Sequence, residues 1–169
     1  MSDESRMPFD LESYVERVRT GPCFVCGIVD GRAHQPEHVV YRDERHIAFL
    51  ARFPVLLGYV LVAPVGHREA VADDFTTDEY LALQAVVHRV ARALATVVPT
   101  ERVYVLSLGS QQGNAHVHWH VAALPPGVPY DEQQFHALMT EAKGVLVLSD
   151  DEQRELAQGI RAAIAALGG

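Results

Sequence analysis

The sequence has 169 residues, 49% of them hydrophobic and 21% charged, which is the size and composition of one folded, soluble domain. The formal net charge of −8 argues against binding to nucleic acid or to anionic lipid, but it does not exclude a small phosphorylated substrate. Because no apolar run could span a bilayer and the polar amino terminus lacks a secretory signal, we expect a cytoplasmic protein without membrane partners.

The first part of the chain predicts a helix followed by antiparallel strands. The helix is expected over Asp10–Thr20, before the Gly-Pro pair that follows it. Two β-like runs, His38–Tyr41 and His46–Leu50, are separated by four charged residues and therefore predict a hairpin. The next run, Tyr59–Ala63, is apolar enough to be a central strand.

The strongest helical pattern covers Thr77–Val98, where Thr76 and Glu79 have the spacing of a capping box and Pro99 marks the end. Apolar residues recur on it at three- and four-residue steps, as expected of one buried stripe. The stripe consists of Tyr80, Leu83, Val87, Val90, Leu94 and Val97.

Two further strands and two helical stretches are expected after this helix. The strands are Val103–Leu108 and Ala115–Leu124, and the helical stretches lie near Glu132–Ala142 and over Asp151–Leu167. Strand pairs joined by short turns, with one long helix inserted, predict an α+β fold with a mainly antiparallel five-stranded sheet.

The most informative segment carries three alternating histidines, His116, His118 and His120. Side chains alternate faces along a strand, so the three imidazoles should project together while Val117, Trp119 and Val121 enter the core. A metal-dependent hydrolase or oxygenase could use such a cluster. However, the outer two residues start about 13 Å apart at ~3.3 Å per residue, so one ion cannot readily take all three. Nucleophilic catalysis by the middle imidazole is the alternative, because a largely neutral histidine keeps one ring nitrogen unprotonated.

Cys23 and Cys26 stand three residues apart, ahead of the first strand. In a reducing compartment this spacing indicates a metal or redox site rather than a structural disulfide. Two thiolates supply half of a tetrahedral zinc site. A thioredoxin-like dithiol is disfavoured, because no strand-to-helix redox context surrounds the pair.

The His-x-His-x-His motif, followed by apolar residues and Pro125, resembles the signature of the histidine-triad (HIT) superfamily. Three more segments look like that family's amino-terminal segment and its next two strands: Cys23–Gly31, His46–Pro54 and Gly58–His67. The resemblance covers about residues 21–125, and the Leu-x-Arg-Phe-Pro stretch is most similar to the branch that acts on dinucleoside polyphosphates. It implies one HIT-like domain over residues 1–169, with an N-terminal helix and a C-terminal helical extension outside the core.

The resemblance also implies an activity and its residues. Members hydrolyse or transfer nucleotidyl groups through a covalent nucleotidyl-histidine intermediate, formed at the α-phosphate. By this resemblance His118 is the nucleophile, and His120 contacts and neutralises the phosphate oxygens. The preceding loop would present Gln111, Gln112 and Asn114 as donors to the phosphates, which suits a phosphoryl transition state.

The same resemblance completes the metal site and suggests an assembly. In zinc-bearing members the remaining ligands match His67 and His116, which implies a structural Cys₂His₂ zinc site with Cys23 and Cys26. That ion would position the chemistry without performing it. Members commonly form homodimers, and the apolar stripe on Thr77–Val98 fits such an interface or equally a packing against its own sheet.

Three departures from the family pattern concern substrate recognition and leave the histidines intact. Tyr59 follows Gly58 where many members have histidine, and we interpret it as a half-buried strand aromatic rather than a substrate contact. Ala51 replaces a polar residue that often holds the ribose, and the usual Ala-Gly-Gln segment before the triad is absent. A non-catalytic nucleotide-binding module therefore remains the main alternative to an enzyme.

Overall fold

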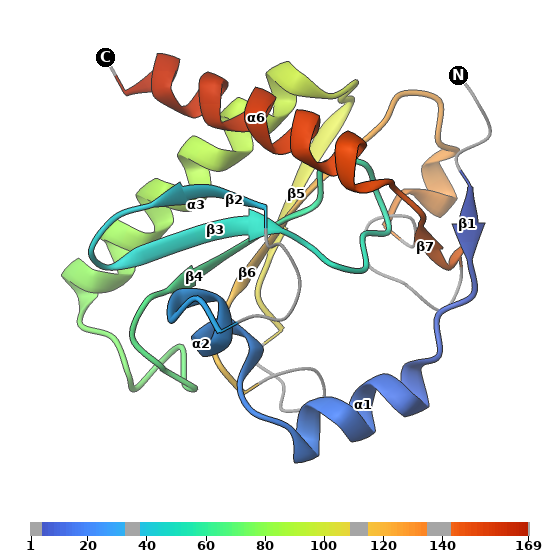
Figure 1. The fold of residues 1–169 in the computed structure, drawn as a ribbon. Helices are drawn as coiled ribbons and strands as arrows, with labels where there is room; N and C mark the ends of the chain where they lie inside the picture. The colour runs from blue at the N-terminus through green and yellow to red at the C-terminus, as the bar shows by residue number, and fades with distance from the viewer. Residues whose placement is uncertain (1–4, 33–37, 109–114, 135–142, 169) are drawn as a thin grey trace.

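The computed structural model describes residues 5–32, 38–108, 115–134 and 143–168. Its main feature is a five-stranded sheet in the order β2-β3-β4-β6-β5, in which every pair of neighbours is antiparallel (Figure 1). This confirms the predicted α+β class and the predicted hairpin. The strands are β2 Val39–Arg42, β3 His46–Leu50, β4 Val60–Pro64, β5 Arg102–Leu106 and β6 Trp119–Leu124.

The predicted long helix is α3, Thr77–Val97, and it begins at the predicted capping box. The Thr76 hydroxyl accepts the Glu79 backbone N–H, while the Glu79 carboxylate accepts the Thr76 backbone N–H. This exchange satisfies two backbone donors at the helix start. A second capping box, between Ser149 and Glu152, begins the predicted C-terminal helix, α6, Asp150–Leu167.

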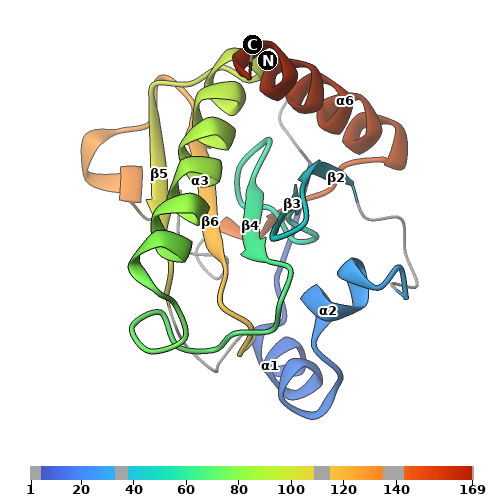
Figure 2. The same cartoon turned by 90° about the vertical axis from the view of Figure 1, so that its left-hand side faces the viewer.

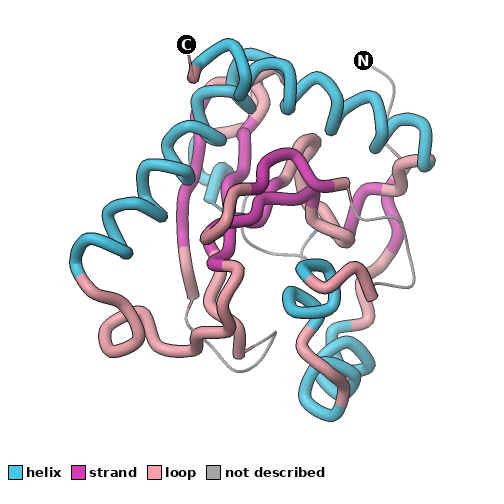
Figure 3. The backbone as a smooth tube through the Cα atoms, turned by 60° about the vertical axis from the view of Figure 1, so that its left-hand side comes forward, coloured by secondary structure: helices cyan, strands magenta, loops and turns pink. Residues whose placement is uncertain are grey.

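Two helical layers sandwich the sheet, as Figures 2 and 3 show. The apolar stripe of α3 and one side of α6 pack on one face, in a core that includes Leu83, Val90, Ile160 and the sheet residue Val121. The apolar stripe of α3 therefore packs against the sheet of its own chain. On the other face lies the short helix α2, Phe24–Val29, whose apolar side chains pack against a second core around β3 and β4. The histidine segment reaches this second face.

The N-terminal part forms elements of its own. The predicted first helix is α1, Leu11–Thr20, with Asp10 as its N-cap. Ahead of it, β1, Arg6–Met7, pairs with β7, Val145–Leu146, in a two-stranded antiparallel sheet. Neither two-residue strand was expected, since so short a run carries no alternation pattern. Within the described residues, no helix is both long and apolar enough to cross a membrane.

One predicted element differs in the structure. The last strand begins at Trp119 rather than at Ala115, because the Val117 N–H donates to the carbonyl of Arg68 (2.7 Å) and not to a neighbouring strand. Two of the three histidines therefore precede the strand. The predicted helix Glu132–Ala142 can be compared only at its start, where a 3-10 turn over Tyr130–Glu132 leads into helical residues at Gln133 and Gln134; residues 135–142 lie outside the described part.

Candidate active site and metal-ligand cluster

Four side chains from distant parts of the sequence converge beneath the sheet: Cys23, Cys26, His67 and His116. Cys23 is the N-cap of α2 and Cys26 follows within its first turn, whereas the histidines come from the loop after β4 and from the segment before β6. One potential ligand atom of each lies within 4.8 Å of the others. The predicted set is therefore assembled, and it could hold a metal ion.

Both histidines direct Nδ1 at the sulfurs. The Cys23 Sγ–His116 Nδ1 distance is 3.5 Å, and the Cys26 Sγ–His67 Nδ1 distance is 3.3 Å. The opposite nitrogens have fixed acceptors, because His116 Nε2 donates to the Pro64 carbonyl (2.9 Å) and His67 Nε2 to a Glu69 carboxylate oxygen (3.0 Å). With a metal bound, each Nδ1 would therefore offer the lone pair that a ligand requires, whereas without a metal the His116 Nδ1 can donate a proton to the Cys23 sulfur. The two acceptors are of the kind that orient ligating histidines. Two thiolates and two such imidazoles suit tetrahedral zinc.

The two thiols differ in their ionisation. Burial raises the pKa of Cys23, but hydrogen bonds with His116 and Cys26 outweigh it and bring the pKa to about 6. For Cys26, burial and then the hydrogen bond with Cys23 raise the pKa to about 11. Without an ion, the pair therefore holds a single negative charge near neutral pH. A bound cation would favour the loss of the second proton.

His118 lies beside this cluster with its ring orientation fixed. Its Nδ1 is 2.8 Å from the carbonyl oxygen of His116, and the edge-on ring of Phe24 has its centroid 6.1 Å from that of the imidazole. A carbonyl can only accept, so Nδ1 carries the proton and Nε2 the lone pair. Burial lowers the pKa of His118, which keeps the ring neutral. The arrangement therefore supplies a neutral imidazole with an unprotonated nitrogen, the form of histidine that attacks electrophiles.

His120 is the neighbour of His118 on the same side of the sheet, with 4.8 Å between the ring centroids. Its Nδ1 lies 3.2 Å from the hydroxyl oxygen of Tyr59. Burial, followed by the charge of His118, lowers the pKa of His120 to about 3, so this ring is also neutral in the free protein. The backbone between the two histidines is held in place, because the Ser107 hydroxyl donates to the His118 carbonyl (2.8 Å).

The three histidines have different neighbours in the structure. The rings of His118 and His120 lie together, whereas His116 is fully buried and its ring contacts His67 and the cysteines. All three rings still lie on the side of the sheet that carries α2, opposite the core residues Val117, Trp119 and Val121, as the alternation predicts; only their neighbours differ. The predicted phosphate-binding side chains, Gln111, Gln112 and Asn114, lie outside the described residues.

Two partners of the site were given no role by the sequence: Tyr59 was interpreted as a strand aromatic, and Glu69 was not singled out. Tyr59 is not half-buried but only 8% exposed, and it bonds to His120. Its position in the sequence could have indicated this contact, because the family that the motif resembles usually has a polar residue there. Glu69 orients His67, and its signal was an acidic residue two positions after a candidate ligand.

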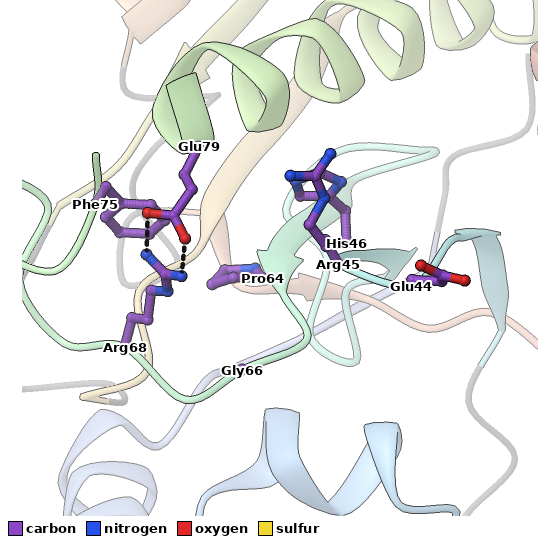
Figure 4. A pocket seen from close by; sticks show the side chains of 8 residues that line it. All are labelled: Glu44, Arg45, His46, Pro64, Gly66, Arg68, Phe75 and Glu79. Carbon is purple, nitrogen blue, oxygen red and sulfur yellow. Dashed lines mark hydrogen bonds and ion pairs between the residues drawn. The ribbon is translucent and has the colours of Figure 1, made fainter. Parts of the chain in front are cut away.

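A pocket of about 120 Å³ lies where β3 begins and β4 ends, near the start of α3 (Figure 4). Its lining includes the ion pair between Arg68 and Glu79, and Phe75, which packs edge-on against Trp119 on the face opposite His118. Nucleotide-sized ligands need roughly 300 Å³ or more, so this pocket is too small to enclose one. Its ion pair instead ties the loop that carries His67 to the capping box of α3.

Comparison with known sequences identifies relatives of this chain. The profile of the HIT domain matches residues 32–126. The chain is 29% identical over 148 residues to an uncharacterized HIT-like protein of Mycobacterium tuberculosis, which covers 85% of this chain and 94% of the relative. It is 30% identical over 102 residues to an uncharacterized HIT-like protein of Saccharolobus solfataricus, with 59% of this chain and 71% of the relative covered.

Solved structures with the same fold include two of note. A hypothetical histidine triad nucleotide-binding protein from Sulfolobus tokodaii superposes with a TM-score of 0.69 and 26% identity, over 86% of this chain and 93% of its own. A zinc-bound histidine triad family protein from Mycobacterium smegmatis gives a TM-score of 0.65 and 24% identity, over 86% and 95%. At 24% identity, the similarity to the Mycobacterium smegmatis protein shows a shared fold and nothing more.

Proposed function

This chain belongs to the histidine triad (HIT) domain family, and we propose that it is a nucleotide hydrolase or nucleotidyl transferase with His118 as its nucleophile. The observation that carries the proposal is the hydrogen bond from His118 Nδ1 to the His116 carbonyl, which leaves the lone pair on Nε2. The structural relative from Sulfolobus tokodaii is named as a nucleotide-binding protein, which supports nucleotides as the class of substrate. The substrates would be dinucleoside polyphosphates, nucleoside phosphoramidates or related nucleotidyl compounds.

The reaction would proceed in two steps. His118 Nε2 attacks the α-phosphorus, a nitrogen–phosphorus bond forms, and the bond to the leaving group breaks with its electron pair on the departing atom. The ring becomes cationic, and the His116 carbonyl stabilises the Nδ1 proton. Water or another acceptor then attacks the phosphorus, the electron pair of the nitrogen–phosphorus bond returns to Nε2, and the acceptor's proton is released.

The remaining residues of the site would hold the phosphate. His120, next to the nucleophile, contacts the phosphate oxygens, and Gln111, Gln112 and Asn114 contribute further donors. Donors placed where negative charge develops lower the barrier of phosphoryl transfer. Phe24, whose ring lies edge-on to His118, would cover one side of the reacting group.

We further propose that Cys23, Cys26, His67 and His116 hold a structural zinc ion. The support is the donor set, two sulfurs and two Nδ1 atoms whose rings are oriented by acceptors, together with a zinc-bound relative of the same fold. When bound, the ion would tie α2 and the loop after β4 to the segment that carries the nucleophile. It would fix positions and take no part in the bond changes.

The test of the enzymatic proposal is capture of the covalent intermediate. The protein is mixed briefly with a panel of adenylated and guanylated dinucleoside polyphosphates and phosphoramidates, and its intact mass is measured. We expect a nucleoside-monophosphate adduct that is absent in His118→Asn and retained in His88→Asn, a change at an exposed histidine of α3. Binding without adduct or turnover for every compound would instead favour the non-catalytic nucleotide-binding module.

We also propose a homodimer, formed through the edge strand β5 and the adjacent side of α3. Val105 and Leu108 at this edge are 46% and 70% exposed, and Leu81 on α3 is 58% exposed. Such apolar exposure along a sheet edge is typical of a surface that another chain covers. Light scattering should give twice the chain mass, and Val105→Glu should give monomers, whereas Val147→Glu on β7's flank should not. A monomeric wild type would reject the dimer.

A further inference from the structure

Tyr59 places its hydroxyl group against the ring of His120. The residue precedes β4 and is 8% exposed, and its hydroxyl oxygen lies 3.2 Å from His120 Nδ1. The two rings meet edge-on, at 85° and with 5.7 Å between centroids. The sheet register sets this contact, because Leu61, on the same face as Tyr59, is paired with His120.

The direction of this hydrogen bond follows from the donor and acceptor properties of the Tyr59 hydroxyl and the His120 ring. Within the described part of the chain, the Tyr59 hydroxyl has no acceptor other than His120 Nδ1. Leaving a buried hydroxyl without an acceptor costs about 1–3 kcal/mol. A phenol is a stronger donor than a neutral imidazole N–H, and an imidazole lone pair is a stronger acceptor than a phenol oxygen. Tyr59 therefore donates, and Nδ1 of His120 carries no proton.

This places the proton of neutral His120 on Nε2, the reverse of the arrangement in His118. There the His116 carbonyl holds the proton on Nδ1 and leaves Nε2 unprotonated. The two rings, 4.8 Å apart, thus offer one lone pair and one N–H. A lone pair is what the attack on phosphorus needs, and an N–H is what a non-bridging phosphate oxygen accepts.

We propose that Tyr59 is a positioning residue, which fixes His120 in the Nε2–H tautomer so that this neutral ring donates to the phosphate beside the nucleophilic Nε2 of His118. The proposal rests on the proposed function and deepens it. It replaces charge neutralisation by His120 with an oriented hydrogen bond. Burial raises the pKa of the Tyr59 phenol, so the hydroxyl keeps the proton that it donates.

The tautomers can be observed without any substrate. Long-range ¹H–¹⁵N correlation spectra of the histidine-labelled protein near pH 7.5 distinguish Nδ1–H from Nε2–H rings. We expect His120 as Nε2–H and His118 as Nδ1–H, with His120 assigned by the loss of its signals in His120→Asn. An Nδ1–H or doubly protonated His120 in the wild type would overturn the proposal.

The variant Tyr59→Phe removes only the hydroxyl, and Tyr41→Phe is its matched control, because the Tyr41 hydroxyl bonds to Asp43 instead. We expect Tyr59→Phe to shift His120 toward a mixture of tautomers and Tyr41→Phe to leave it unchanged. An unchanged His120 spectrum in Tyr59→Phe would contradict the positioning role. The wild-type spectrum remains decisive should this variant be unstable.

Kinetic measurements distinguish the role of Tyr59 from the role of His118 as nucleophile. Loss of one oxyanion donor costs about 100–1000-fold in turnover, and a donor that is only misoriented should cost less, about 10-fold in kcat with little change in KM. A Tyr59→Phe variant with wild-type kcat would reject the role of Tyr59 while leaving His118 as nucleophile. If no compound were turned over, the enzymatic proposal would fail, and the tautomer spectra would still test the hydrogen bond.

Discussion

The carbonyl oxygen of His116 accepts the Nδ1 proton of His118 at 2.8 Å, while the ring of the same His116 belongs to the cluster with Cys23, Cys26 and His67. One residue thus serves two sites, its side chain as a potential ligand and its backbone as the acceptor that orients the candidate nucleophile. Any ion in the cluster is therefore separated from the nucleophile by a single residue's backbone. The predictions on metal content follow from this link.

Removal of the metal should weaken the fold before it affects the chemistry. A structural ion that stabilises the folded state by a few kcal/mol raises the melting temperature by roughly 2–4 °C per kcal/mol in a chain of this size. We expect chelation to lower the melting temperature by on the order of 10 °C, with adduct formation declining only as the protein unfolds. Immediate loss of turnover at an unchanged melting temperature would instead indicate catalysis by the ion.

Glu69 should determine how tightly the metal is held. Its carboxylate accepts from His67 Nε2 at 3.0 Å, and this hydrogen bond is the main cause of the raised pKa of His67. Loss of such an orienting carboxylate typically weakens metal binding 10–100-fold, so Glu69→Gln should raise the zinc Kd by about that factor. Competition with a chromophoric chelator measures it. Glu155→Gln, at an exposed site on α6, should leave the Kd unchanged, and an unchanged Kd in both variants would show that Glu69 is not needed.

Local sequence signals predicted most of the fold. The capping box at Thr76 and Glu79 gave the start of α3, and strand alternation placed Trp119 and Val121 in the core. These features depend on neighbours within a few residues, so they are visible in a single sequence. The start of β6 was misplaced, because the Val117 N–H is bonded to Arg68, a residue far away in the sequence.

The chemistry of the site depended on contacts between distant residues. The proton of His118 is set by a backbone carbonyl, and that of His120 by a tyrosine 61 positions earlier. Spacing could suggest that both histidines are functional, but it could not assign which nitrogen of each carries the proton. Only the three-dimensional arrangement makes that assignment.

The stability of the protein should fall with decreasing pH in a window set by His120. Burial and then the charge of His118 lower its pKa to about 3, whereas an unfolded histidine has a pKa near 6.5. Between these values the unfolded chain binds the proton and the folded chain does not, so acidification favours unfolding. One such histidine lowers the free energy of unfolding by up to about 1.4 kcal/mol for each pH unit of acidification between the two pKa values. Below the pKa of the folded state, its contribution to stability is lost completely.

Urea denaturation between pH 7 and pH 4.5 measures this slope. In His120→Asn the free energy of unfolding should fall less steeply, by about 1 kcal/mol per pH unit. His88→Asn, on the exposed side of α3, should retain the wild-type slope. Parallel curves for His120→Asn and the wild type would mean that His120 takes up its proton in the folded protein as readily as in the unfolded chain.

Gly58 should be the least replaceable glycine near the site. Its φ of +74° lies in the left-handed region, and a Cβ at this position would come within 2.6 Å of the Cδ1 atom of Leu94. Leu94 is fully buried in the α3 core and cannot move aside freely. The strained backbone costs about 1–2 kcal/mol and the overpacking about 1–3 kcal/mol, so Gly58→Ala should lower the free energy of unfolding by on the order of 3 kcal/mol.

The matched control is Gly66→Ala, at the other end of β4. No described atom lies within 4 Å of its added Cβ and its φ is not in the left-handed region, so the change should stay within about 0.5 kcal/mol. Because Gly58 is followed by Tyr59, its replacement should also displace the phenol from His120 and shift the ¹⁵N signals of that ring. Equal stability of the two variants, with unchanged His120 signals, would mean that the entry into β4 does not hold Tyr59 in place.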